Sequence, residues 1–195
     1  MGLDMYLSKA PKINGYSFEK ILQIEERCYN FKNFQNSELY EEVKPFIKKK
    51  DENIEWYGLL EEVGYWRKAN AIHKWCEENL KFITDGYYEV TKKDLEKLKR
   101  VCEFVIEKSK MVDGMISVGQ RLTDNGWEDI LEEGKIISNP EIAREYLPTT
   151  RGCFFGSTDY DEFYIYKLSN TIQIIDDVLK KTDFEKEFLV YWASW

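Results

Sequence analysis

Several signatures that would identify an enzyme class or a metal centre are missing from this chain of 195 residues. Its cysteines, Cys28, Cys76, Cys102 and Cys153, are widely spaced and form no C-x-x-C pair, so neither a zinc site nor a disulfide framework is predicted. His73 is the only histidine, and one imidazole cannot complete the ligand set of a zinc ion. Neither the Walker spacing G-x-x-x-x-G-K-[ST] nor the nucleophile elbow G-x-S-x-G is present.

Excess positive charge and long apolar runs are also absent. The 28 basic and 36 acidic side chains give a net charge of −8. Binding of a nucleic-acid polymer depends mainly on Lys and Arg at phosphates, so no nucleic-acid polymer is expected as a partner. No apolar run approaches the roughly 18 residues of a membrane span, and no signal peptide is recognisable. The sequence therefore predicts a cytoplasmic protein with reduced thiols and no membrane contact.

Aromatic side chains, by contrast, are abundant. The chain has 13 Tyr, 11 Phe and 6 Trp, within an ordinary hydrophobic content of 43%. Its length is sufficient for a single domain, residues 1–195, with a substantial core. Each ring can bury roughly 150–250 Å², so the surplus predicts either an aromatic-rich core or a surface on which other rings stack.

Apolar periodicity predicts an α+β fold in which a small mixed sheet, containing strands from both termini, is packed by about four helices. Leu3–Ser8 alternates as a half-buried strand does, and Phe188–Trp195 is apolar on both faces, as a central strand is. Thr91 with Asp94 predicts a capped helix over Thr91–Lys108. The other expected helices begin at Ser17 or span Glu38–Lys50, Glu62–Leu80, Asn139–Tyr146 and Leu168–Lys180. The other expected strands span Tyr87–Val90, Gly152–Gly156 and Phe163–Tyr166, and Ile54–Leu60 is either a short strand or the lead-in to the helix that follows it.

Two segments of this organisation are less regular. Residues 17–50 combine two helical patterns around a polar stretch, and Pro45 weakens the second, so this segment is interpreted as a helical arm or lid. Glycines recur throughout Asp113–Pro140, and the prediction there is loops with little regular structure.

The first candidate ligand motif is E-E-V-G-Y-W-R-K-A-N-A-I-H-K-W, at Glu61–Trp75. On one helix, Trp66, Asn70 and His73 would lie along one edge with Arg67 further round. An indole stacks on a base, an amide pairs with a base edge, and a guanidinium grips a phosphate. The motif therefore predicts a nucleotide-like site, although the ring and the imidazole could equally be packing residues.

The second candidate motif is L-P-T-T-R-G-C-F-F-G-S-T-D-Y-D, at Leu147–Asp161. Glycine beside hydroxyls lets backbone N–H groups approach an anion closely, whereas the alternative interpretation is an ordinary tight turn. We expect His73 and Asn70 to face residues 156–160 of this motif across one pocket. The predicted ligand-binding residues of the second motif are Arg151, Phe155, Gly156, Ser157, Thr158 and Tyr160.

Acidic side chains at the end of the second motif are candidate metal ligands. Asp159, Asp161 and Glu162 offer the hard oxygens that Mg²⁺ or Ca²⁺ prefers. Their spacing is unlike an EF-hand, and acidic residues on a loop are usually solvated. The sequence therefore predicts no metal site and no cofactor.

Both motifs, the start M-G-L-D-M-Y-L and the aromatic end Ala193–Trp195 resemble an uncharacterised family of small phage and prophage proteins. The resemblance implies a phage context, in the cytoplasm of a host cell, and supplies no catalytic residues. Its leading implication is a non-enzymatic counter-defence protein that sequesters a small nucleotide-like immune signal, such as a cyclic oligonucleotide or a cyclic ADP-ribose derivative.

 A homo-oligomer is expected, because protomers often combine in proteins of this kind.

Two other functions stay open at this point. The chain could inhibit a host protein by binding it directly, since a net charge of −8 suits a cationic target. It could also be a hydrolase or transferase that uses His73 as a base together with Asp159 or Asp161, which requires these side chains to lie within about one hydrogen bond or one water of each other.

Overall fold

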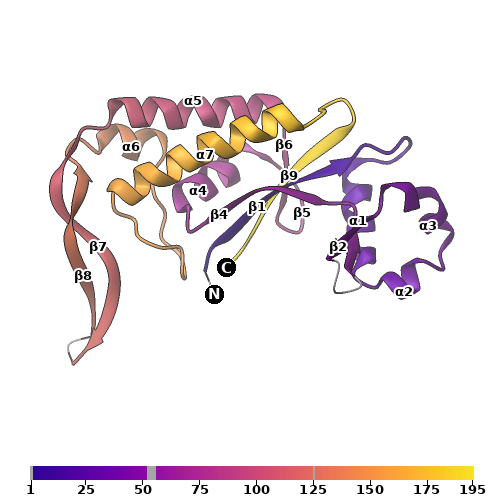
Figure 1. The fold of residues 1–195 in the computed structure, drawn as a ribbon, viewed down its shortest axis with the longest axis horizontal. Coiled ribbons are helices and arrows are strands. Elements are labelled where there is room, and N and C mark those ends of the chain that lie inside the picture. Colours follow the sequence, from indigo (N-terminus) through magenta and orange to yellow (C-terminus); the bar gives the residue numbers. More distant parts are fainter. Residues whose placement is uncertain (1, 52–55, 125) are drawn as a thin grey trace.

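A five-stranded antiparallel sheet lies at the centre of the computed structural model, which describes residues 2–51, 56–124 and 126–195 (Figure 1). The strand order is β4-β1-β9-β6-β5. The two terminal strands, β1 and β9, are neighbours, with Leu7 opposite Tyr191. In the order given, the strands span Glu61–Arg67, Asp4–Pro11, Glu187–Ser194, Tyr87–Val90 and Lys81–Thr84.

The predicted α+β class is confirmed, as are the presence of both terminal strands in the sheet and the central position of the last strand. The prediction of a mixed sheet is wrong, because all four pairings in this sheet are antiparallel. The tight turn at Asp85 and Gly86 joins β5 to β6, and so short a connection can join only antiparallel strands.

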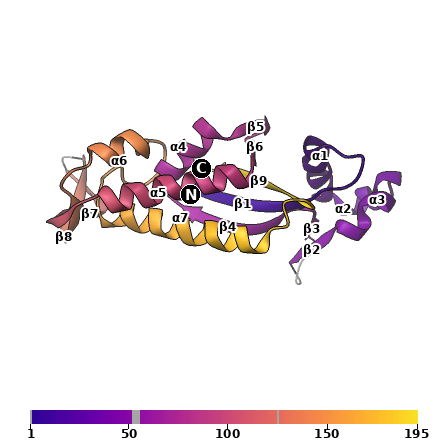
Figure 2. The same cartoon turned by 90° about the horizontal axis from the view of Figure 1, so that it is seen from above.

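Helices cover the sheet, and α5 (Lys92–Lys108) and α7 (Glu162–Lys181) lie side by side over it (Figures 1 and 2). The predicted cap of α5 is confirmed, since the Thr91 hydroxyl accepts from the Asp94 amide and the Asp94 carboxylate accepts from the Thr91 amide. A Cβ at Gly64 of β4 would lie 2.6 Å from the Ile174 side chain, so glycine at this position lets α7 approach the sheet closely. No described helix is both long enough and apolar enough to cross a membrane.

A second group of helices packs at one end of the sheet, around its own cluster of buried residues. Helix α1 begins after Ser17, as predicted, because the Ser17 hydroxyl accepts from the Lys20 amide. The buried Glu25 carboxylate accepts from the amides of Leu59 and Leu60 and ties α1 to the chain beyond β3. The elements of this group are α1 (Phe18–Cys28), α2 (Phe31–Phe34), α3 (Glu38–Val43), the 3-10 helix η1 (Lys44–Phe46), β2 (Lys48–Asp51) and β3 (Trp56–Gly58).

The structure refines the predictions for this group. The helical pattern of Glu38–Lys50 ends at Val43, one residue before the position that Pro45 disfavours. The strand predicted at Ile54–Leu60 is shorter, Trp56–Gly58, and residues 52–55 lie outside the described residues. Buried residues of α1 share a cluster with Val190 of β9, and a lid function for residues 17–50 stays a prediction.

The prediction of irregular loops at Asp113–Pro140 is wrong. Strands β7 (Met111–Thr123) and β8 (Gly126–Ile137) form a long antiparallel hairpin that projects from the end of the molecule opposite α1–α3 (Figures 1 and 2). Gly114 pairs with Gly134, so glycines that suggested loops lie in strands. The next helix, α6 (Glu141–Tyr146), is present as predicted.

Two further predictions of secondary structure are wrong. The predicted helix Glu62–Leu80 is a strand, β4, followed by the helix α4 (Asn70–Asn79), because residues up to Arg67 pair with β1. The predicted strands at 152–156 and 163–166 are a turn and the first part of α7. Helix α7 starts at Glu162 because the Asp161 carboxylate accepts from the Tyr164 amide as an N-cap.

Candidate functional site

The candidate site begins where β4 changes into α4. The backbone turns at Lys68, whose φ of 54° lies in the left-handed region that side chains other than glycine rarely adopt. The Lys68 amide donates to the Leu3 carbonyl at 2.7 Å, so the turn is held by the start of β1. The turn places Asn70 at the first position of α4, where its side chain is buried.

Asn70 joins α4 to the loop of residues 149–160. Its Nδ2 donates to the carbonyls of Phe155 and Ser157, at 3.1 and 2.9 Å, and its Oδ1 accepts from the Thr150 amide at 3.3 Å. These three bonds use most of the hydrogen-bonding capacity of an amide side chain. Asn70 therefore positions the loop and has little capacity left for a ligand.

Internal hydrogen bonds fix the conformation of this loop. The Thr149 hydroxyl donates to the Thr158 carbonyl at 2.9 Å, and the Thr149 amide donates to the Tyr160 hydroxyl at 3.2 Å. The Ser157 hydroxyl donates to the Asp159 carboxylate at 2.8 Å and accepts from the Asp159 amide. Thr158 and Tyr160, two predicted ligand residues, thus contribute to the shape of the loop.

His73 lies one turn further along α4 and is only 3% exposed. Its Nδ1 is 2.7 Å from the Tyr191 hydroxyl, and its ring meets the rings of Phe155 and Trp195 edge to face. Burial lowers the pKa of His73 below 6.5, although the Glu77 carboxylate opposes this effect. The imidazole is therefore a neutral group inside an aromatic cluster.

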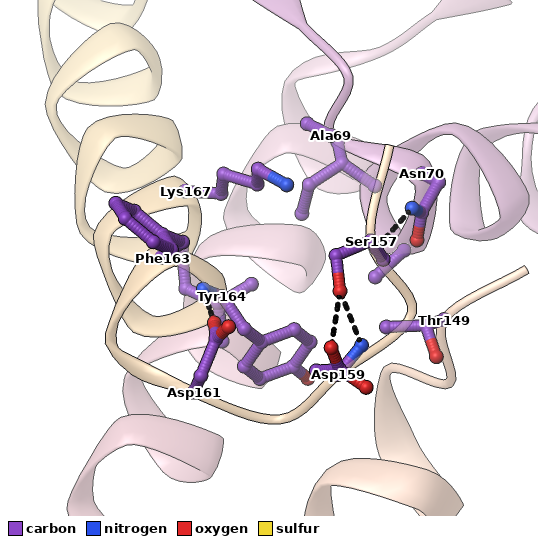
Figure 3. Close-up of a pocket in the computed structure, with 12 residues that line it drawn as sticks. Ala69, Asn70, Thr149, Ser157, Asp159, Asp161, Phe163, Tyr164 and Lys167 are labelled. Atoms are coloured by element: carbon purple, nitrogen blue, oxygen red, sulfur yellow. Dashed lines mark hydrogen bonds between the residues drawn. The ribbon is translucent and has the colours of Figure 1, made fainter. Parts of the chain in front are cut away.

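A small cleft opens between the start of α4, the loop and the start of α7 (Figure 3). Its enclosed space of about 20 Å³ suits a molecule the size of water. The Asp161 Oδ1 accepts from the Tyr164 amide at 2.9 Å, whereas its Oδ2 is buried and receives no hydrogen bond from the described residues. Ser157, Asp159 and Lys167 also line this cleft.

Burial shifts the pKa values of two charged groups that line the cleft, Asp161 and Lys167. It raises the pKa of Asp161, against the hydrogen bond from the Tyr164 amide, and it lowers the pKa of Lys167, against the nearby Asp161 charge. Asp159 bonds to Ser157, and within the described ranges no three His, Cys, Asp or Glu residues are grouped as metal ligands would be. The cleft is thus a small space that is lined by two partly desolvated charged groups.

The structure corrects the ligand flank predicted for the first motif. Trp66 and Arg67 are successive residues of a strand, so their side chains point to opposite faces of the sheet. Trp66 is 4% exposed and its indole donates to the Thr171 hydroxyl at 3.0 Å, so it is part of the core. Arg67 is exposed, with Nε 3.9 Å from the Asp4 carboxylate.

Only part of the predicted shared pocket is present, because Asn70 meets residues 156–160 and His73 contacts the residue before them. Asn70 bonds to Ser157, and His73 contacts Phe155, the residue before Gly156. Phe155 is buried in this contact, whereas Arg151, Gly156 and Ser157 are exposed. The side chains of α4 thus bind the loop directly and leave no nucleotide-sized space between the two segments.

The exposed residues Arg67, Lys68, Phe154 and Trp195 form a group that we call the terminal patch, and of these four sequence reasoning identified only Arg67 as a ligand residue. A Cβ at Gly2 would lie 3.5 Å from the Lys68 side chain and 3.8 Å from that of Arg67, which places both cations beside the N-terminus. Phe154 is bonded to Leu3 through its carbonyl, and Trp195 lies against Phe155. The pairing of the terminal strands could have indicated that Trp195 lies near this motif.

The chain was compared with known proteins. No protein-family model matches it, and neither a curated protein nor a solved structure is significantly similar to it.

Proposed function

We propose that this chain is a non-enzymatic protein that binds and sequesters a small nucleotide-like signalling molecule at the terminal patch. Phe154 and Trp195 are 56% and 58% exposed, and exposed rings of this kind stack on a base. Arg67 and Lys68 stand beside them and supply the donors that grip a phosphate. Arg151 is exposed in the same loop as Phe154 and adds a further cation.

The observation that carries this proposal is the backbone of Lys68 and Phe154. Their φ angles of 54° and 64° are left-handed, which costs roughly 1–3 kcal/mol for a residue other than glycine. Both residues bond to Leu3. The Lys68 amide donates to the Leu3 carbonyl, and the Leu3 amide donates to the Phe154 carbonyl. Strain of this kind clusters at ligand sites, and here it turns a cation and a ring toward solvent at one place.

The ligand surface proposed here, the terminal patch, differs from the one that the first motif predicted. Trp66 is in the core, and the cleft beside Asp161 is too small for a nucleotide. A ligand would therefore lie on the surface formed by the terminal patch, with the loop of residues 149–160 as its floor.

The buried position of His73 makes an enzymatic alternative less favourable. A general base must reach the proton that it removes, and the imidazole instead contacts Tyr191, Phe155 and Trp195. Direct inhibition of a host protein is the second candidate, and the exposed acidic hairpin β7–β8 is the feature that favours it. The resemblance of both motifs to phage proteins supports a counter-defence role in the host cytoplasm for either candidate.

A release experiment tests the proposal. The purified protein is incubated with a panel of cyclic oligonucleotides and cyclic ADP-ribose derivatives, freed of unbound ligand and heated, and the released compound is identified. Intact release supports binding, and release of an altered compound indicates an enzyme. Absence of release for the whole panel would refute nucleotide binding and leave direct inhibition of a host protein.

Matched variants locate the site in the same experiment. Arg67→Ala and Trp195→Ala should release much less compound than the wild type. Arg100→Ala, at an exposed cation of α5, and Tyr29→Ala, at an exposed ring beyond α1, are the controls and should release as much as the wild type. Equal release from all four variants would place the ligand elsewhere.

A further inference from the structure

The hairpin β7–β8, which we call the arm, presents exposed apolar side chains to solvent on a face that also carries Asp129 and Glu133. Leu131 pairs across the arm with Ser117, and its neighbour two positions along, Glu133, pairs with Met115. Residues two apart on a strand share a face, so Met115 and Leu131 lie on the same side, and the register beyond the bulge after Ser117 adds Leu122 to it. These three side chains are 53%, 54% and 70% exposed.

The arm has little support of its own. Its base is fixed by the Ile137 amide, which donates to the Tyr160 carbonyl, and by a bridge between Ile136 and Asp161. Its outer part consists of two strands paired with each other, and an isolated two-stranded hairpin is only marginally stable in water. Exposed apolar side chains gathered on such a hairpin are typical of a surface that a partner covers.

The charge of the arm limits what this partner can be. Residues 111–137 contain six acidic and two basic side chains, a net charge of −4, which is half of the −8 of the whole chain. Two arms packed against each other would bring like charges together, which is unfavourable. The complementary surface is cationic and contains exposed rings.

The terminal patch of the same chain has this chemistry, with Arg67 and Lys68 beside Phe154 and Trp195. The outer ends of β7 and β8 and the two ends of the chain point toward the same side of the molecule (Figure 1). A two-fold rotation can therefore place each arm beside the termini of a second copy, and two-fold dimers are the commonest oligomers.

We propose that the chain forms a two-fold dimer in which the arm of each copy lies across the terminal patch of the other. The exposed apolar side chains of the arm pack on the rings, and its acidic side chains lie near the cations. The role of this arrangement in ligand binding rests on the proposed function. The terminal patch of one copy would leave a nucleotide largely exposed, whereas binding sites usually enclose roughly 70–90% of a ligand. The arm of the second copy would cover the exposed side of the nucleotide. The dimer itself requires no ligand.

Cys153 allows a direct test without any nucleotide. It is exposed and precedes Phe154 of the terminal patch, whereas Cys28, Cys76 and Cys102 are buried. In a Leu122→Cys variant, oxidation by oxygen with copper–phenanthroline should join the introduced thiol to Cys153 of the second copy. A disulfide-linked dimer, identified by peptide mass spectrometry, is the expected product.

Controls make the cross-link specific. Tyr29→Cys introduces an exposed thiol at the opposite end of the molecule and should give no cross-link to Cys153. Adding Cys153→Ser to the Leu122→Cys variant should abolish the cross-linked dimer. If a dimer linked through position 122 of both copies persists, the arms pair with each other and the proposal is overturned.

The mass in solution provides an independent measurement. Sedimentation equilibrium should show a dimer for the wild type, and Leu122→Ser combined with Leu131→Ser should weaken dimerisation by about tenfold or more, as the loss of central apolar contacts usually does. Tyr29→Ser is the matched control and should leave the dimer unchanged. A wild-type chain that stays monomeric at high micromolar concentration would overturn the proposal and would favour a basic host protein as the occupant of the arm.

The two proposals fail in different ways. A dimer that releases no nucleotide refutes the proposed function and supports the arrangement of the arms. A monomer that releases an intact nucleotide refutes the arrangement of the arms and supports the proposed function.

Discussion

His73 of α4 and Tyr191 of β9 are joined inside the core by a hydrogen bond of 2.7 Å between Nδ1 and the hydroxyl oxygen. Burial raises the pKa of Tyr191 well above its ordinary value, so its hydroxyl stays protonated and can donate to a neutral imidazole. The other ring nitrogen, Nε2, lies 3.6 Å from the Glu77 carboxylate. The pair therefore links the helix beneath the candidate loop to the central strand of the sheet.

This pair predicts that the protein loses stability in mild acid. Burial lowers the pKa of His73 in the folded state, so the unfolded chain takes up a proton near pH 6.5 while the folded chain does not. The free energy of unfolding should therefore fall as the pH drops from about 7 to 5, above the range in which exposed carboxylates titrate. Urea denaturation at several pH values measures this slope. His73→Gln cannot take up a proton and should have a flatter profile; equal slopes for both proteins would contradict the prediction.

Trp66 is predicted to be a stability residue, contrary to its expected role as a ligand platform. Trp66→Ala should lower the free energy of unfolding by about 3–5 kcal/mol, because it leaves a cavity beneath α7 and removes the hydrogen bond to Thr171. Denaturant titration checks this value. Tyr29→Ala, at an exposed ring, should change it by less than about 0.5 kcal/mol. A Trp66→Ala variant as stable as the wild type would show that the ring does not belong to the core.

Local signals in the sequence were sufficient where the structure depends on neighbouring residues. Thr91 with Asp94 marks the start of α5, and Ser17 marks the start of α1, because a cap needs only side chains within one turn. The terminal strands were also predictable, since alternation in one and apolar faces in the other indicate their burial.

The sequence was insufficient to predict the structure where pairing between distant segments determines it. Residues of β4 have a helical spacing with those of α4, and only the pairing with β1 makes them a strand. Gly64 was a signal against a helix, but its close packing with Ile174 depends on the position of α7. The same limit explains why Trp66 was predicted at a site and why Trp195 was not, since the distance between Trp195 and Phe155 depends on the whole sheet.

Asn70 is predicted to control the order of the loop that supports the terminal patch. Asn70→Ala removes the bonds to Phe155, Ser157 and Thr150 and leaves their backbone groups without these partners. Amide hydrogen exchange in residues 150–158 should become about tenfold faster or more, since one net hydrogen bond contributes about 1 kcal/mol. Asn79→Ala is the matched control on the same helix, because Asn79 bonds only to Trp75 and Lys97 among the described residues. Unchanged exchange in Asn70→Ala would show that the loop holds its shape without this side chain.

The last prediction concerns Asp161, which caps α7 through Oδ1 while its buried Oδ2 receives no hydrogen bond from the described part of the chain. Burial raises the pKa of this carboxyl above 3.8, so the folded protein holds the proton more tightly than the unfolded chain does. Its contribution to stability is therefore fully present below pH 3.8 and is lost as the pH rises through the folded-state pKa. At pH 7 the ionised carboxylate therefore lowers the free energy of unfolding, and the hydrogen bond from the Tyr164 amide partly offsets this effect.

Two variants of Asp161 separate the charge from the cap. Asp161→Asn keeps an oxygen that accepts from the Tyr164 amide and removes the charge, so at pH 7 it should be at least as stable as the wild type. Asp161→Ala removes the cap as well and should lose about 1 kcal/mol relative to Asp161→Asn. The advantage of Asp161→Asn over the wild type should shrink as the pH approaches 4, because the wild-type carboxyl then becomes neutral. Denaturant titration at pH 7 and pH 4 measures both differences. If Asp161→Asn is as destabilised as Asp161→Ala at pH 7, the ionised carboxylate is stabilised in the folded state, and Lys167, whose charge acts on Asp161 across the cleft, is the group that stabilises it.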